Sequence, residues 1–308
     1  MAITTTGDFA KEEADELLRR VTSQIARATK SQGIDEMHDL RVAIRRFTRI
    51  LAVLKPCFPR SESRRMRSGL KRIMLQAGDV RNYDIAVHLI TRIELPESGS
   101  LVRHYHIVRE QAATTLKASL QRWTSRNLSA RWRAALKSDR PRGDDARFCA
   151  VPIDITIKRI LPDLVAEHFH DGEAAVKKRT PAHKIHRFRI AAKHFRYTLD
   201  FFAPFCSQTL SALVDRLKDV QTLLGDINDC ATVRRIVKEE TTSESDKAVR
   251  KDILSALKKR QRKKTEEFQE QFAAEFSNAS VLRQWQDSVH RGFVPERVSR
   301  KPSARYRQ

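Results

Sequence analysis

Two stretches of this chain, HDLRVAIRRFTRILAVLKP at residues 38–56 and HRFRIAAKHFRYTLDFFAP at residues 186–204, repeat one pattern at an offset of 148 residues. Six of the 19 aligned positions are identical: His, Arg, Ala, Phe, Leu and Pro. A second pair of blocks, LKRIMLQAGDVRNY (70–83) and LKDVQTLLGDINDC (217–230), follows in the same order at an offset of 147. This order indicates an internal duplication, and we expect two helical halves related by a pseudo-two-fold axis.

The first block reads in both copies as an amphipathic helix whose polar face carries positive charge. With His38 at zero, Arg41, Arg45 and Arg49 fall at about 300°, 340° and 20° on a helical wheel, opposite the apolar residues. The second copy places four residues at the corresponding positions, and we call the two sets the basic stripes: His38, Arg41, Arg45 and Arg49 in the first copy, and His186, Arg189, Lys193 and Tyr197 in the second.

The basic stripes favour a bound anion over a merely solvated helix face. Like charges spaced i, i+4 destabilise a helix, and an anionic ligand would offset that cost. Arginine makes two parallel hydrogen bonds to phosphate oxygens and stays charged at every relevant pH, and histidine adds a donor whose pKa is expected to rise beside a polyanion. The net charge of +22, from 60 Lys and Arg against 38 Asp and Glu, also implies an anionic partner.

The composition is that of an all-α globular protein. Gly and Pro together number only 19 of 308 residues, whereas helix formers are abundant. Apolar periodicity and capping signals predict helices at 8–29, 35–55, 61–77, 80–92, 99–138 (with a break near Asn127), 152–170, 180–203, 208–224, 226–240, 245–276 and 279–290. Asp35 and Thr180 are the predicted N-caps of two of these helices. We therefore expect an N-terminal half (8–138), a linker (139–151), a C-terminal half (152–290) and a basic, frayed tail (291–308).

The cysteines and the N-terminus bear on the compartment. Cys57, Cys149, Cys206 and Cys230 form no CxxC pair and indicate no disulfide framework, so we expect a reducing, cytoplasmic location. The first 18 residues lack the apolar segment of a signal peptide, and no apolar run approaches the length of a membrane span.

The paired motifs HDLRVAIRRFTR and HRFRIAAKHFRY, each followed by a K…GD block, resemble the CHAD domain (conserved histidine α-helical domain) over nearly the whole chain. The resemblance implies two four-helix bundles related by pseudo-two-fold symmetry. It also implies that basic residues from both halves line a central cavity that binds inorganic polyphosphate. The expected partner is therefore polyphosphate, including polyphosphate granules, and no cofactor is expected.

Carried over onto this chain, the family motif implies one main set of polyphosphate ligands: His38, Arg41, Arg45, Arg49, Lys71, His186, Arg189, Lys193 and Lys218. A second set extends the basic surface: Arg46, Arg64, Arg67, Arg81, His194, Arg196 and Tyr197. The family often follows the glycine of the second block with Arg-Asp-x-Asp. Here the stretch reads Arg81-Asn82-Tyr83-Asp84 in the first half and Asn228-Asp229 in the second, and we interpret these polar residues as helix caps or as partners of arginines. Because Tyr197 replaces an arginine, we expect the binding surface to be asymmetric.

Three other functions were weighed. Nucleic-acid binding, RNA above all, is the main alternative, although no zinc-finger spacing, RNP-type motif or helix-turn-helix array supports it. A metal site is disfavoured because the chain has no HExxH motif and no pair of Glu-x-x-His motifs, and because arginines adjoin His38 and His186. Catalysis on phosphate is not expected, since the chain has no Glu-x-Glu-x-Lys signature, no glycine-rich phosphate loop and no carboxylate–metal pair on the basic face. We therefore predict a binding protein rather than an enzyme.

Overall fold

The protein is described by a computed structural model that covers residues 4–95, 98–138, 141–178, 180–205, 208–240 and 247–291. The regular elements of these residues are helices: α1 (Thr6–Lys30), α2 (Ile34–Val53), η1 (Lys55–Cys57), α3 (Arg60–Thr91), α4 (Gly99–Ser125), α5 (Leu128–Ser138), α6 (Gly143–Ala150), α7 (Ile153–Ala175), α8 (Ala182–Phe202), η3 (Ala203–Phe205), α9 (Gln208–Glu239), α10 (Lys247–Phe276) and α11 (Ala279–Arg291). The predicted all-α class is confirmed. Cys206 and the basic tail beyond Arg291 lie outside the described residues.

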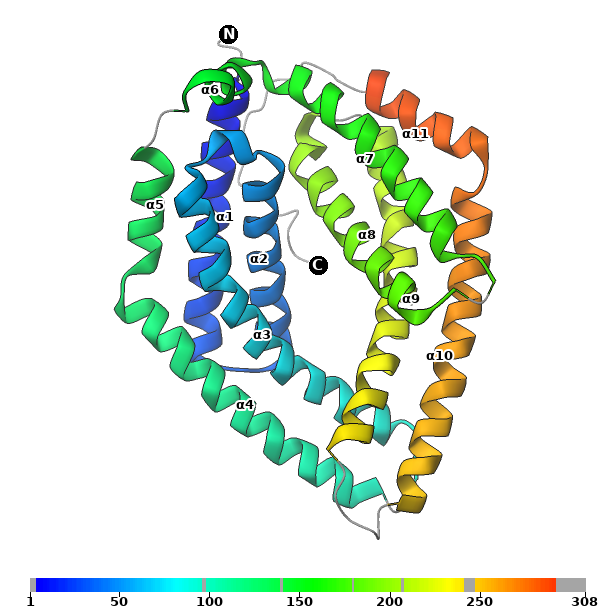
Figure 1. Cartoon of the computed structure of the whole chain (residues 1–308). Coiled ribbons are helices and arrows are strands. Elements are labelled where there is room, and N and C mark those ends of the chain that lie inside the picture. The colour runs from blue at the N-terminus through cyan, green and yellow to red at the C-terminus, as the bar shows by residue number, and fades with distance from the viewer. Residues whose placement is uncertain are drawn as a thin grey trace.

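The helices of the two sequence halves form two groups that stand side by side (Figure 1). In the first, α1 packs on α2, α4 and α5, and α3 packs on α2 and α4. In the second, α7 packs on α8 and α11, and α9 packs on α8 and α10. The two groups contact each other through α2 with α8 and through α3 with α9, which are the two helix pairs that carry the repeated blocks. The pseudo-two-fold axis, the central cavity and the domain boundaries stay predictions.

Two predicted helix breaks are wrong, because α3 and α9 each continue through the glycine of the second block. A glycine inside a helix costs about 1 kcal/mol relative to alanine. The residues on either side of Gly78 and Gly225 are buried at regular helical spacing, including Ala77 and Val80 in α3 and Leu224 in α9. Packing of that continuous apolar face outweighs the local cost of one glycine.

The two predicted N-caps also need correction, and part of the predicted linker is helical. Gly33 rather than Asp35 is the N-cap of α2, and Asp35 lies in its first turn, where its charge favours the positive end of the helix dipole. Pro181 is the N-cap of α8, whereas Thr180 donates its hydroxyl to the Lys177 carbonyl at 2.6 Å. Residues 143–150, predicted as part of a linker, form α6, whose first turn carries two acids. The predicted break near Asn127 is confirmed, with a φ of 47° at that residue.

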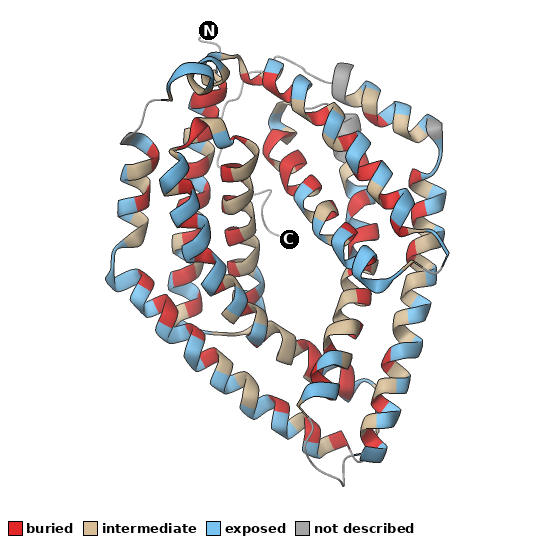
Figure 2. Cartoon of the chain, in the orientation of Figure 1, coloured by how far each residue is buried: buried red, intermediate tan, exposed pale blue. Residues whose placement is uncertain are grey.

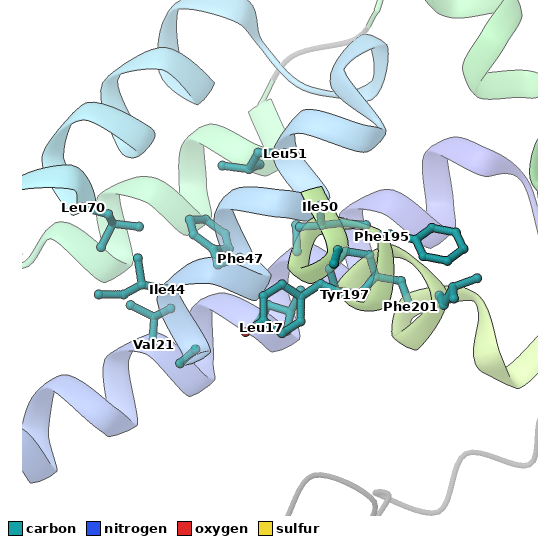
Figure 3. Packing of buried hydrophobic residues seen from close by; sticks show 14 of the residues in the cluster. Leu17, Val21, Ile44, Phe47, Ile50, Leu51, Leu70, Phe195, Tyr197 and Phe201 are labelled. Atoms are coloured by element: carbon teal, nitrogen blue, oxygen red, sulfur yellow. The ribbon is translucent and has the colours of Figure 1, made fainter. Parts of the chain in front are cut away.

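Most buried side chains belong to one apolar cluster that runs through both halves. The long helices turn one buried side inward, while their remaining sides are exposed or partly buried (Figure 2), and α6 has no buried residue. Leu17 and Val21 of α1, Ile44 and Phe47 of α2 and Leu70 of α3 meet on one side of α2 (Figure 3). The apolar side of α2 is therefore fixed against α1 and α3, and its arginines project from the remaining sides of the helix.

A second, smaller apolar cluster joins the far ends of α3 and α9, at the lower end of Figure 1. It combines buried residues of α3 and α4 with buried residues of α9 and α10: Ile85, Ala86, Leu89, Ile90, Leu101 and Tyr105 with Cys230, Val233, Ile236, Val237, Val249, Ile253 and Leu257. The two halves therefore contact each other through α2 on α8, through this cluster, and also through α1 on α7. The basic stripes lie on α2 and α8, the helices of the first of these contacts.

Candidate polyanion-binding site

The basic stripe of α2 and the first three positions of the stripe of α8 lie outside the apolar cluster, as predicted, whereas Tyr197, the fourth position of α8, is buried in that cluster. Leu40, Ile44, Phe47 and Leu51 of α2 are buried, whereas Arg41 and Arg45 are only partly buried. The same division holds in α8, where the phenylalanines are buried and Arg189 and Lys193 are partly buried. The periodicity of the sequence was therefore sufficient to separate the two faces.

Six of the predicted ligands come from three helices and act on one another electrostatically. We call them the central basic cluster: His38, Arg41 and Arg45 of α2, Arg81 of α3, and Arg189 and Lys193 of α8. Burial lowers the pKa of Arg41 to about 10, with further contributions from Arg45, Arg189 and Arg81. Burial also lowers the pKa of Arg189, where Arg45 again contributes. Both halves of the chain therefore supply positive charge to a single place.

The pKa of Lys193 is lowered further than that of Arg41. Burial lowers the pKa of Lys193 to about 6, and the charges of Arg189, Arg45 and Arg41 lower it in addition. The carboxylate of Asp229 in α9 acts in the opposite direction. At neutral pH the ligand-free protein therefore holds Lys193 mostly as the neutral amine.

Two histidines lie at the edges of the central basic cluster. Burial lowers the pKa of His38, and Arg81, Arg45 and Lys193 contribute while Asp39 opposes them. Burial also lowers the pKa of His194, together with the nearby charges of Arg49 and Arg45. Both histidines are thus poised to gain a proton when an anion neutralises the surrounding arginines.

Arg41 is held in place by α3. Its Nη1 donates to the Met74 carbonyl at 3.0 Å. A Cβ on Gly78 would lie 2.9 Å from the same Nη1 atom, so the glycine leaves room for the guanidinium. The repeated glycine, which the sequence analysis took for a helix break, is therefore a packing device in the first half. In the second half, a Cβ on Gly225 would meet nothing within 4 Å.

Arg46, Arg49 and Arg196 are engaged at the contact between α2 and α8. Arg46 Nη2 lies 2.9 Å from Asp200 Oδ2, and Arg49 Nε donates to Thr198 Oγ1 at 2.9 Å. Arg196 lies 3.6 Å from the same Asp200 carboxylate and donates to Gln221 Oε1 at 2.8 Å. Arg46 and Arg49 join the halves, whereas the partners of Arg196 lie in its own half. The prediction that Arg49 is a main ligand is therefore the weakest of the first stripe.

Tyr197 replaces the fourth cation of the second stripe and is buried at 1% exposure. Its ring lies below two guanidinium groups, with Arg196 Cζ at 4.9 Å and Arg46 Cζ at 5.9 Å from the centroid. Such cation–π contacts stabilise charge at a partly buried site. Tyr197 therefore supports the contact between the halves rather than exposing a donor to a ligand.

Asp84 and Asp229 interact with arginines, as one of the two interpretations held, whereas Asn228 contacts a histidine. Asp84 lies 3.0 Å from Arg109 Nε, and Asn228 Oδ1 lies 2.9 Å from His186 Nδ1. Asp229 raises the pKa of Arg189 and Lys193. The alternative interpretation as helix caps is wrong, because α3 and α9 continue past these positions.

The remaining candidates lie on the exposed sides of α3 and α9. Lys71, Arg64 and Arg67 are exposed, and Lys71 lies two helical turns before Gly78 on the same side of α3. Lys218 is exposed and pairs with Asp215 at 2.9 Å within α9. Their part in ligand binding stays a prediction.

The structure adds residues that the sequence analysis did not select. Asp200 and Thr198 carry no signal in the sequence, because their partners Arg46 and Arg49 are about 150 residues away. His168 is fully buried and stacks on Phe195 at 4.6 Å, and burial lowers its pKa to about 3. Within the described ranges, no group of three or more His, Cys, Asp or Glu side chains could hold a metal ion. In the same ranges, no helix is long and apolar enough to cross a membrane.

The sequence and the fold are both similar to those of known proteins. A CHAD domain family model matches residues 12–238. The fold is similar to the crystal structure of the CHAD domain from the plant Ricinus communis, with a TM-score of 0.65 and 18% identity over 94% of this chain and 93% of that one. It is also similar to PptA from Streptomyces chartreusis, with a TM-score of 0.62 and 16% identity over 87% of this chain and 99% of that one. No curated protein matches the chain.

At these identities the solved structures show a shared fold, while the family model covers well over half of the sequence. The repeated His-x-x-Arg blocks, the helical architecture and the family match agree, and the chain belongs to the CHAD domain family.

Proposed function

We propose that this protein binds inorganic polyphosphate without transforming it, through the central basic cluster. The observation that carries the proposal is the gathering of cations from α2, α3 and α8, where burial first and mutual repulsion second lower the pKa of Arg41 and Lys193. Fixed positive charges held this closely repel one another, and a polyanion would relieve the repulsion. Membership of the CHAD family, which is linked to polyphosphate, agrees with this ligand.

A linear chain of phosphates suits the cluster for two further reasons. Arginine side chains dominate it, and their planar guanidinium groups match phosphate oxygens in pairs. The cluster draws on both halves of the chain, so a long anion could touch α2 and α8 together. Each neutralised phosphate releases counterions, and we expect the affinity to fall steeply as salt is added.

Charge reversal at the centre of the cluster tests the proposal. Arg45→Glu combined with Lys193→Glu should reduce the affinity for long-chain polyphosphate at least 100-fold, because two attractive charges become repulsive. Calorimetry at fixed salt would measure the change. Lys258→Glu with Lys259→Glu, on the exposed side of α10, replaces two basic residues by glutamates outside the cluster and should retain most of the binding.

Three outcomes would count against this proposal. Binding of tRNA or duplex DNA that is tighter than binding of polyphosphate, at equal phosphate concentration and salt, would favour the nucleic-acid alternative. Loss of cooperative melting in the Arg45→Glu, Lys193→Glu variant, and also in its neutral Arg45→Gln, Lys193→Gln counterpart, would show that the two residues are structural. Release of orthophosphate or shortening of the chain during incubation would contradict the non-enzymatic part of the proposal.

The same binding would bring the protein to polyphosphate granules in the cytoplasm. A fluorescent fusion should colocalise with granules, and the charge-reversed variant should not. Diffuse fluorescence of the wild-type fusion in granule-containing cells would contradict this location.

A further inference from the structure

The central basic cluster makes no use of the cysteines, yet the fold brings two of them together. Cys57 ends η1 and Cys149 lies near the end of α6, 92 residues later, and their Sγ atoms are 2.9 Å apart. A disulfide has an S–S length of about 2.05 Å, so bond formation needs a movement of only about 0.9 Å. Both residues are free thiols in this structure.

The surrounding backbone holds this arrangement. The segment after α6 is bound to the start of α1, where the Thr6 amide and hydroxyl both donate to the Val151 carbonyl at 2.8 Å. A Cβ on Gly7 would lie 3.1 Å from Cys149 Cβ, so α1 and α6 approach closely at this point. Since η1 also packs on α1 and α6, neither thiol can move far from the other.

The two thiols differ in access. Cys57 is 1% exposed, whereas Cys149 is partly exposed. Burial raises the pKa of both thiols; the contact with Cys57 lowers the pKa of Cys149, whereas the contact with Cys149 raises that of Cys57. Cys149 is therefore the thiol that an oxidant reaches and the one that ionises first.

We propose that Cys57 and Cys149 are an oxidative modification site, at which a hydroperoxide converts the dithiol into a reversible disulfide that ties α6 to η1. The Cys149 thiolate attacks the peroxide oxygen, the O–O bond breaks, and a sulfenic acid forms as hydroxide leaves. The Cys57 sulfur then attacks the Cys149 sulfur, the S–O bond breaks, and water leaves. In sum, two thiols and one hydrogen peroxide give one disulfide and two waters, so the dithiol loses the two electrons that the peroxide gains.

The consequence of the bond is greater stability against unfolding. η1 follows α2 directly, and α6 belongs to the segment that connects the two halves. The bond would close a loop of 92 residues and remove conformations mainly from the unfolded chain. We expect the melting temperature to rise by roughly 5–10 °C.

The experiment treats the reduced full-length protein with hydrogen peroxide and maps non-reduced peptides by mass spectrometry. The expected result is a linked pair of peptides that contain Cys57 and Cys149, a higher melting temperature, and reversal of both by dithiothreitol. The reaction should accelerate as pH rises, because the attacking thiolate becomes more abundant. Cys230→Ala is the matched control and should retain the linked peptides.

Three results would overturn the proposal. They are Cys149 oxidised to sulfinic acid without a linked peptide, a bond that joins a different pair of cysteines, and a linked product whose melting temperature equals that of the reduced protein. Cys57→Ala and Cys149→Ala should each abolish the melting shift. If either variant fails to fold, peptide mapping of the wild-type protein still decides the question. None of these readouts depends on polyphosphate binding.

Discussion

The two repeated helix pairs, α2 with α3 and α8 with α9, share a motif but treat their charges differently. In the first, the Arg41 guanidinium is anchored on the α3 backbone beside Gly78, and Arg81 adds a further cation. In the second, Lys193 replaces an arginine, and the aligned positions of α9 carry Asn228 and Asp229. The first pair presents permanent positive charge. The second contains the Lys193 amine, which can lose its proton, and the Asp229 carboxylate, whose negative charge partly offsets the charge of the neighbouring cations.

The two copies of a duplicated unit can thus contribute differently to the attraction of an anion. A guanidinium remains charged whatever its surroundings, so α2 supplies constant attraction. An amine surrounded by cations ionises only when an anion arrives, so α8 supplies attraction that depends on pH and on the ligand. The following substitutions test that difference between the two helix pairs.

The largest expected effect is the pH dependence that Lys193 introduces. Binding a polyanion should restore the proton that Lys193 has lost above about pH 6, so the affinity of the wild-type protein should fall by up to tenfold for each pH unit above 6. Lys193→Arg, which copies Arg45 into the second half, should remove this slope and bind up to about 100-fold more tightly at pH 8. Calorimetry in buffers of different ionisation enthalpy would count the protons taken up.

The same group has a defined effect on stability without ligand. The unfolded chain keeps the Lys193 proton up to about pH 10.5, whereas the folded protein releases it near pH 6. The unfolded state therefore binds more protons in this window, and the contribution of Lys193 to stability decreases as pH falls from 10.5 toward 6. Equal pH slopes for wild type and Lys193→Arg, in binding and in melting, would refute the division between the halves.

A smaller effect is expected from the two repeated glycines. Gly78→Ala would place a methyl group 2.9 Å from the present position of Arg41 Nη1, so the guanidinium must move and polyphosphate affinity should fall about 3- to 10-fold. Gly225→Ala has open space and is the matched control. Both changes gain up to about 1 kcal/mol of helix propensity, so Gly225→Ala should raise the melting temperature without affecting binding. Equal affinities of the two variants would show that the position of Arg41 is unimportant.

The smallest effect should come from exchanging the polar residues of the second block. Asp229→Asn removes the carboxylate that opposes the cations of α8 and should raise the affinity about 2- to 5-fold at low salt. Asn82→Asp, at the aligned position of α3, should lower it by a similar factor. Both effects should shrink as salt is added. A change in the opposite direction for either variant would mean that these positions act through structure rather than charge.

Much of the architecture could be predicted from local pattern. Apolar spacing correctly identified the buried sides of α2 and α8, for example Leu40 and Phe47 against Phe188 and Phe195. The helix breaks at Gly78 and Gly225 were predicted wrongly because the low helix propensity of glycine takes no account of its surroundings. In the folded protein, packing of the buried sides of α3 and α9 stabilises both helices through these positions. The N-cap of α8 was misplaced for a similar reason, since the Thr180 hydroxyl found a carbonyl in the preceding turn.

The candidate site divides in the same way. The stripe positions follow from helical periodicity, and the duplication singled out Arg41, Arg189 and Lys193. The loss of Arg46 and Arg49 to the contact between the halves did not follow, because Asp200 and Thr198 are about 150 residues distant. Neither could the sequence show that Cys149 lies against Cys57.

By itself, the sequence determined the all-helical class, the duplicated unit and the face of each repeated helix that carries charge, because these depend on residue types at a short, regular spacing. Only the tertiary structure decided which arginines stay available to an anion, which residues join the halves, and why Lys193 loses its proton. Those properties depend on distances between segments far apart in the chain, and on burial, which raises the electrostatic cost of every unpaired charge.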